Sequence, residues 1–153
     1  MTSYQRFFIG GSGGASALAD AGLLILRLLA GFALAYYHGL GKLPPSPGFI
    51  EGVAAMGFPA PTFFAWAAGL AETVGGAFLA LGLLTRPASF FILCTMASAF
   101  FLRHAEDTFL QAEKAYLFGS IALCFLLVGA GRFSLDRLLR GWLVTPRVSR
   151  YAR

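Results

Sequence analysis

Four long apolar blocks, separated by short polar or proline-rich breaks, dominate the pattern of the chain. They run from about residue 21 to 42, 62 to 84, 87 to 102 and 109 to 130. A helix of about 20 apolar residues crosses the hydrocarbon core of a bilayer. The third block is the shortest, so we expect Arg103 at its end to extend its long side chain to the interface. The pattern predicts an all-α integral membrane protein built as a four-helix bundle.

Two shorter segments show amphipathic helical patterns outside these spans. Ser46 and Pro47 can begin a short helix between spans 1 and 2, which we expect to form an interfacial or partly re-entrant lid. Its apolar side consists of Phe49, Ile50, Val53 and Met56. A second helix follows the fourth block and should lie on the membrane surface, because its arginines fall outside its apolar stripe. That stripe consists of Leu135, Leu138, Leu139, Trp142 and Leu143.

The pattern divides the chain into three parts. Residues 1–19, with a glycine-rich run at residues 10–14, predict a flexible leader. Residues 20–131 form the four-span bundle, with Asp20 as the expected N-cap of the first helix and a capping box at residues 108–111 opening the fourth. Residues 132–153 form a basic amphipathic segment. Small residues precede the first apolar block instead of following it, which argues against a cleaved signal peptide, so we expect the first helix to be retained.

The charge distribution fits a membrane protein and predicts its orientation. Only 12% of the residues are charged, against about 25% in soluble domains, and 58% are hydrophobic. The net charge of +5 comes mostly from arginines near the C-terminus, which indicates contact with anionic membrane lipids and not with nucleic acid. Four spans place eight basic residues on the side of both termini and three on the other side. The positive-inside rule therefore predicts a multi-pass protein of the inner (plasma) membrane with both termini cytoplasmic.

Glu72 is the single charged residue of the second apolar block. An ionised acid near mid-bilayer costs about 2.5 kcal/mol or more, so it should be protonated, paired or turned toward a cavity. Its helical face carries small residues, which lets neighbouring backbones approach and indicates that Glu72 points into protein; they are Ala65, Ala68, Gly69, Gly75 and Gly76. We expect Arg27, in the first span, to reach Glu72 as an ion pair. Such a pair either fixes helix register or takes part in chemistry, and both interpretations stay open.

A second polar group is expected at the outer ends of the spans, where His38, Lys42, His104 and Glu113 could converge. A quinone needs hydrogen-bond donors at its carbonyl oxygens and a route for protons, and histidine can supply both. Tyr36, Tyr37 and Trp66 would add aromatic walls. The catalytic candidates are then Glu72, His38 and Arg27, and the candidates for binding the quinone are His38, Lys42, Tyr37, Trp66, His104 and Glu113. The alternative is that His38, Lys42 and the tyrosines anchor helix ends at the interface.

Cysteine and metal chemistry receive little support from the sequence. Cys94 and Cys124 lie in separate apolar blocks without a CxxC motif, so we expect small hydrophobic side chains rather than a redox pair, although similar depths in the membrane permit a contact. No two metal-ligating residues have diagnostic spacing, so no metal is expected.

Four short motifs, in order along the chain, resemble those of the DoxX family. They are residues 38–43 (HGLGKL), 72–76 (ETVGG), 82–86 (GLLTR) and 131–136 (GRFSLD). The resemblance covers residues 23–139, most of the chain. It implies a four-helix membrane protein associated with respiratory or sulfur redox systems, in some members as a subunit of a thiosulfate-oxidising, quinone-reducing complex.

Three functions are consistent with these patterns. The first is an accessory membrane subunit that anchors or supports a larger redox complex, or assembles as a homo-oligomer. The second is a quinone-binding oxidoreductase or proton-handling protein in its own right. The third is a small-solute or lipid-binding transporter, for which inverted repeats or broken spans would be expected.

Overall fold

The computed structural model describes residues 16–144, so most of the expected leader and the last arginines of the basic tail lie outside the described residues. Four of the described helices are long and apolar enough to cross a membrane, which confirms the predicted all-α four-span class. The first span, Ala17–Lys42, consists of α2 (Ala17–Phe32), a π-helical stretch η1 (Ala33–Gly39) and a 3₁₀ turn η2 (Leu40–Lys42). The other spans are α4 (Pro61–Leu81), α5 (Thr85–Ser98) with the π-helical η3 (Ala99–Arg103), and α6 (Phe109–Val128). The shorter helices are α3 (Pro47–Ala55) and α7 (Leu135–Val144).

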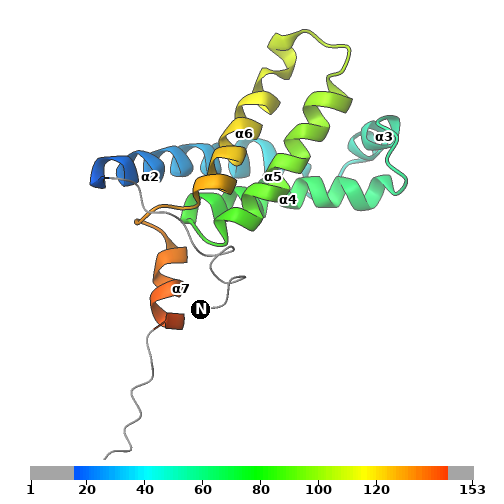
Figure 1. Ribbon diagram of the computed structural model, residues 1–153. Helices are drawn as coiled ribbons and strands as arrows, with labels where there is room; N and C mark the ends of the chain where they lie inside the picture. Colours follow the sequence, from blue (N-terminus) through cyan, green and yellow to red (C-terminus); the bar gives the residue numbers. More distant parts are fainter. Residues whose placement is uncertain (1–15, 145–153) are drawn as a thin grey trace, which may run out of the picture.

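The spans form two helix pairs that meet at α4. Helix α4 packs against the first span on one side and against α5 on another, while α5 pairs closely with α6. Figure 1 shows α2 and α4 lying side by side, with the α5–α6 pair crossing them and extending away. Because the pairs cross, α5 diverges from α4 at the end where α3 packs on α4.

Small residues bring the first span and α4 into close backbone contact. A Cβ atom on Gly31 would lie 2.6 Å from the Ala80 backbone N, and one on Gly76 would lie 2.9 Å from the Ala35 N. A Cβ atom on Gly39 would lie 2.5 Å from the Thr73 N. Gly69 and Gly76 of the small-residue face predicted around Glu72 thus lie in the seam between these two antiparallel helices, whereas Gly75 faces Ile92 of α5.

The predicted start of the first helix was wrong. Ser16 caps the helix, since its side chain accepts from the Ala19 N–H, and the helix begins at Ala17. Asp20 is instead buried, and its carboxylate accepts a hydrogen bond from the Arg132 backbone N–H at 2.9 Å. The other predicted caps are confirmed: Ser46 caps α3, and Thr108 with Gln111 forms the capping box of α6.

The segment after α6 folds back onto the turn between α4 and α5. The Asp136 carboxylate accepts hydrogen bonds from the backbone N–H groups of Leu84 at 2.7 Å and Thr85 at 3.0 Å, which caps the N-terminus of α5. Asp136 also donates its backbone N–H to the Gly82 carbonyl. The GRFSLD motif therefore fastens α7 to the end of the bundle. Helix α7 is the helix predicted to follow the fourth span.

Candidate functional site

The intramembrane acid Glu72 forms an ion pair with Lys42. The Lys42 Nζ lies 2.5 Å from Glu72 Oε1 and 2.6 Å from Oε2. The Glu72 side chain is 2% exposed and the Lys42 side chain 34% exposed, so the pair joins a buried carboxylate to a partly open cation. This confirms that Glu72 points into protein and has a charged partner.

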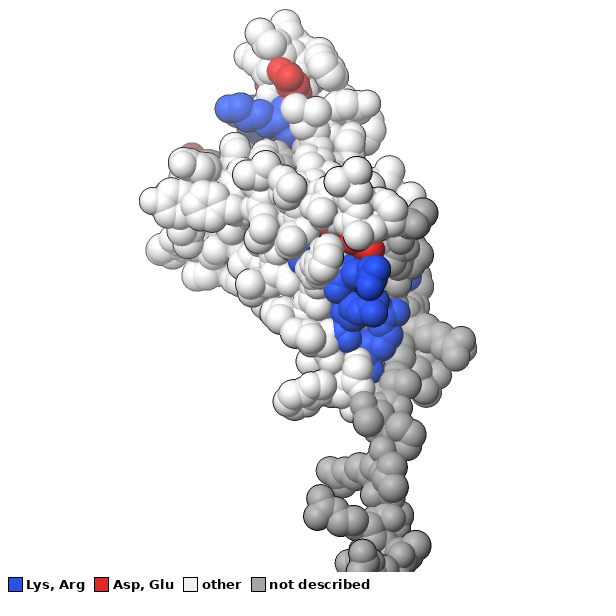
Figure 2. Space-filling view, turned by 90° about the vertical axis from the view of Figure 1, so that its left-hand side faces the viewer, with Lys and Arg blue, Asp and Glu red and all other residues white. Residues whose placement is uncertain are grey.

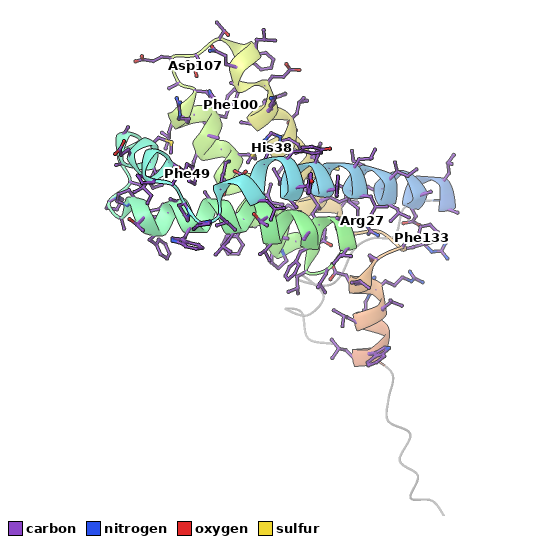
Figure 3. All side chains as sticks on the ribbon, turned by 180° about the vertical axis from the view of Figure 1, so that it is seen from behind. Arg27, His38, Phe49, Phe100, Asp107 and Phe133 are labelled. Carbon is purple, nitrogen blue, oxygen red and sulfur yellow. The ribbon has the colours of Figure 1, made fainter. Side chains whose placement is uncertain are left out.

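Arg27, the partner predicted for Glu72, lies at a different level. Its Nη1 donates to the Ala130 carbonyl at 2.6 Å and its Nη2 to the Phe133 carbonyl. Gly82, at the end of α4, lies directly against the guanidinium. Glu72 is ten residues earlier on the same helix, about 15 Å away at the helical rise of 1.5 Å per residue, so Arg27 cannot reach it. Figure 3 shows Arg27 and Phe133 close together, far from Phe49 at the other end.

The winding of the first span directs Lys42 toward Glu72. The stretch Ala33–Gly39 is π-helical, and a 3₁₀ turn then carries Lys42. A π-turn includes an extra residue, which shifts the faces of the following residues relative to an α-helix. Gly39 of the first span and Gly69 of α4 let the two helices approach closely here. A Cβ atom on Gly39 would lie 2.5 Å from the Thr73 N, and one on Gly69 would lie 3.3 Å from the Lys42 carbonyl oxygen. Lys42 therefore lies opposite the Glu72 face of α4.

A cavity of about 740 Å³ opens beside this ion pair, between α3, α4 and α5. Pockets for small ligands and cofactors have volumes of about 300–1,000 Å³ and mostly apolar walls, so this cavity has the size and character of such a site. Its walls include six phenylalanines, namely Phe49, Phe58, Phe63, Phe64, Phe90 and Phe91. Phe90 and Phe91 are 50% and 60% exposed, on the surface of a membrane-crossing helix. The cavity thus has an apolar wall bordering the membrane and a charged pair inside.

The lid predicted between spans 1 and 2 forms one wall of the cavity. Phe49 and Val53 of α3 and its C-cap Met56 line it, all members of the predicted apolar side. The Lys42 Nζ lies 5.7 Å from the centre of the Phe49 ring, within the range of a cation–π contact. Helix α3 therefore covers the cavity and contacts the ion pair through Phe49.

The structure brings together three of the predicted site residues and places the others elsewhere. Lys42, Glu72 and His104 line the cavity, and His104 Nδ1 lies 2.7 Å from Asp107 Oδ2. The expected convergence of His38 and Glu113 with them is not observed among the lining residues. The His38 ring packs at 5.3 Å on Phe118 of α6, while Glu113 is half-buried on the same helix.

The tyrosines and Trp66 face outward. Tyr37 is 70% exposed and packs edge-on against Tyr36, with ring centres 5.0 Å apart. Trp66 is 43% exposed on α4. Phenylalanines supply the aromatic walls in place of these three residues, and the placement of Tyr37 suits the alternative of an interface anchor.

Both described cysteines are free. Cys94 is exposed and lines the cavity, whereas Cys124 is half-buried on α6. Within residues 16–144, no group of three or more histidine, cysteine or acidic side chains has the geometry of a metal site.

Sequence reasoning missed the contribution of α5 to the site. Phe90, Phe91 and Cys94 lie within an apolar span whose pattern does not single them out, and they reach the cavity because the helix pairs cross. For α3 the signal existed, since its apolar side and its position beside the second span had indicated a lid.

Comparisons with known proteins identify a family and two relatives of this chain. The family model described as DoxX matches residues 22–105, more than half of the chain. An uncharacterized protein of Haemophilus influenzae is 33% identical over 122 residues, covering 74% of this chain and 87% of its own length. A Bacillus subtilis protein named "Putative oxidoreductase CatD" is 28% identical over 118 residues, covering 76% of this chain and 86% of its own. No solved structure matches. The chain is a membrane protein with four candidate spans, and it belongs to the DoxX family.

Proposed function

We propose that this protein is the membrane component of a quinone-linked redox system, and that the cavity beside Lys42 and Glu72 holds the quinone head group. The observation that carries the proposal is a charged pair, with a buried carboxylate and a partly open cation, inside an apolar, phenylalanine-lined cavity whose wall borders the membrane. The name of the Bacillus subtilis relative, "Putative oxidoreductase CatD", supports a redox role. A larger redox complex that contains the protein as a subunit fits the same proposal.

The residues in the cavity fit a quinone head group. The ring is flat and apolar, which suits the phenylalanine walls, and its carbonyl oxygens need donors. The Lys42 ammonium has three N–H donors, of which the Glu72 oxygens accept two. The cavity hydroxyls of Thr95 and Ser98 donate instead to carbonyls of their own helix, those of Phe91 and Cys94. Polar recognition therefore falls to Lys42, with Arg103 and His104 nearer the end of the third span.

The same residues can hold and move protons. A bound quinone supplies the redox chemistry, because it takes up two electrons and two protons on reduction. Glu72 can hold a proton at either carboxylate oxygen, and the adjacent Lys42 stabilises its ionised form once the proton has left. His104, partly exposed and hydrogen-bonded to Asp107, can exchange protons with water at the membrane face. The roles of Glu72, His38 and Arg27 as catalytic residues stay predictions.

Filling the cavity tests this proposal. Ala67 lines the cavity on α4, whereas Ala77 is exposed on the same helix and is not among the lining residues. We expect Ala67→Trp to abolish saturable binding of a short-chain quinone to the purified protein in nanodiscs, measured by equilibrium dialysis. Ala77→Trp should bind like the natural protein. Equal binding by both variants would overturn the assignment of the cavity.

Gentle detergent extraction followed by mass spectrometry tests the redox context. Copurified quinone and larger redox subunits would support the proposal, whereas a single bound solute or lipid in the cavity would favour the transporter hypothesis. We further propose that both chain ends face the cytoplasm, based on the predicted excess of basic residues there. A fluorescent protein that folds only in the cytoplasm, fused to either end, should fluoresce. A reporter enzyme active only outside the cytoplasm, fused at the same ends, should be inactive, and the reverse pattern would contradict this orientation.

A further inference from the structure

A second charged site lies at the opposite end of the first span and is separate from the quinone cavity. Arg27 is only 2% exposed, and among the described residues no carboxylate lies within ion-pair distance of its guanidinium. Its two Nη atoms donate to backbone carbonyls, and its buried Nε has no hydrogen-bond partner. A buried cation is costly unless an anion or a full set of acceptors compensates it. Within residues 16–144, Asp136 attracts the Arg27 guanidinium electrostatically but forms no direct ion pair with it.

The acids nearby are engaged elsewhere. Both oxygens of Asp136 accept backbone N–H groups at the start of α5. Asp20 accepts the Arg132 N–H, and its other oxygen lies 3.9 Å from the Arg132 Nε. Arg132 lies beside Arg27 in the same groove, and Arg137 and Arg140 add positive charge to the segment that follows. Figure 2 shows basic side chains gathered in one patch on this end of the molecule.

A groove of about 480 Å³ lies beside the buried Arg27 guanidinium and the half-exposed Arg132 side chain. Arg27 and Arg132 line it together with apolar residues from three segments, namely Leu24, Leu28, Leu81, Phe133, Leu135 and Leu138. Two guanidinium groups beside leucines of membrane-crossing helices match a molecule that carries an anionic head and apolar chains.

Helix α7 places the groove at the membrane surface. Its apolar side chains are exposed, with Leu138 at 61%, Trp142 at 86% and Leu143 at 58%, while Arg137 on the same helix is also exposed. A helix with exposed apolar and basic sides lies in the interface between head groups and acyl chains. The groove next to its first turn is then at the depth of lipid phosphates.

We propose that this groove binds the head group of an anionic phospholipid. Arg27 and Arg132 contact the phosphate, and the acyl chains pack on Leu24, Leu28 and Leu81. Guanidinium groups bind phosphate oxygens through paired N–H donors, and the surplus of positive charge here favours a lipid with net negative charge over a zwitterionic one. The bound lipid supplies the counter-ion of Arg27 and fastens α7 and the GRFSLD segment to the membrane.

Lipid titration of the delipidated full-length protein tests this site. Native mass spectrometry should show saturable binding of phosphatidylglycerol and weaker binding of phosphatidylcholine. Arg132→Gln, at an exposed position, and Arg27→Gln should each weaken phosphatidylglycerol binding by about tenfold, the loss expected for a charged hydrogen bond. Lys114→Gln, an exposed cation on α6 beyond the groove, should leave binding unchanged.

The outcomes distinguish a lipid from other anions and from a structural role. If Arg27→Gln fails to fold, Arg132→Gln still decides the question, because its side chain is half exposed. Equal affinity for phosphatidylglycerol and phosphatidylcholine would overturn the proposal. So would an Arg132→Gln variant that binds phosphatidylglycerol as tightly as the unmodified protein. Complete displacement of phosphatidylglycerol by millimolar inorganic phosphate would also overturn it, since the site would then accept a free anion. Quinone binding is measured separately, so this test does not depend on the proposed function.

Discussion

Replacing Lys42 with methionine removes the cation that compensates Glu72 while keeping much of the apolar volume of the side chain. The Glu72 carboxylate, 2% exposed, is then left without its partner at 2.5 Å. Removing one partner of a fully buried ion pair costs about 3–5 kcal/mol. Because Lys42 is about one-third exposed, water already screens part of the pair, and we expect about 2–3 kcal/mol for Lys42→Met.

Replacing Glu72, the other partner of the pair, should lower the free energy of unfolding by less. Glu72→Gln keeps the shape and hydrogen-bonding capacity of the side chain, and Lys42 can turn its ammonium toward water or lipid head groups. We expect about 1 kcal/mol for this variant. The double variant Lys42→Met/Glu72→Gln contains no unpaired charge, since neutral replacement of both partners of a buried pair is often nearly neutral. It should therefore be more stable than Lys42→Met alone.

Reversible unfolding by sodium dodecyl sulfate in mixed micelles, followed by circular dichroism, measures these free energies. Lys114→Met is the control, because it removes an exposed lysine and should shift the free energy of unfolding by less than about 0.5 kcal/mol. A double variant whose destabilisation equals the sum of the two single effects would refute the reasoning. So would a Glu72→Gln variant less stable than Lys42→Met.

Three further predictions concern the seam, the α5 cap and the cavity. Gly39→Ala should destabilise the protein by about 1–3 kcal/mol, since its Cβ would lie 2.5 Å from Thr73 N. Gly41→Ala meets no atom within 4 Å and should leave the stability unchanged. Equal thermal stability of the two variants would contradict the close packing of the first span on α4. Asp136→Asn should lower the stability by about 1 kcal/mol, measured by thermal unfolding. An unchanged midpoint temperature would argue against capping of α5 by Asp136. Cys94, which lines the cavity, should react with an apolar maleimide, and added quinone should slow the mass shift; no slowing would place the quinone elsewhere.

The sequence predicts the spans and the environment of Glu72 because both depend on composition and helical periodicity. Long apolar blocks define the four crossings, and the small residues around Glu72 identify the face that packs on another helix. The caps at Ser46 and Thr108 follow from local chemistry and were found correctly. These features need no knowledge of how helices cross.

The partner of Glu72 could not be predicted because it depends on relative depth and local winding. The sequence pattern placed Arg27 within reach of Glu72, whereas the structure sets its guanidinium against Gly82 at the end of α4, ten residues beyond Glu72. Lys42, in the 3₁₀ turn that follows the π-helical stretch, meets Glu72 instead. The contribution of α5 to the cavity depends on the crossing of the two helix pairs, which leaves no periodic signal in the sequence.

Photoaffinity labelling with an azido-quinone, followed by peptide mass spectrometry, tests the central claim most directly. If the cavity beside Lys42 and Glu72 holds the quinone, labels should concentrate on α3 and on the cavity-facing residues of α5 around Cys94, and excess unlabelled quinone should remove them. Glu72→Gln should reduce this labelling. Labels spread over the lipid-facing sides of α2 and α6, insensitive to competitor and to Glu72→Gln, would contradict the account.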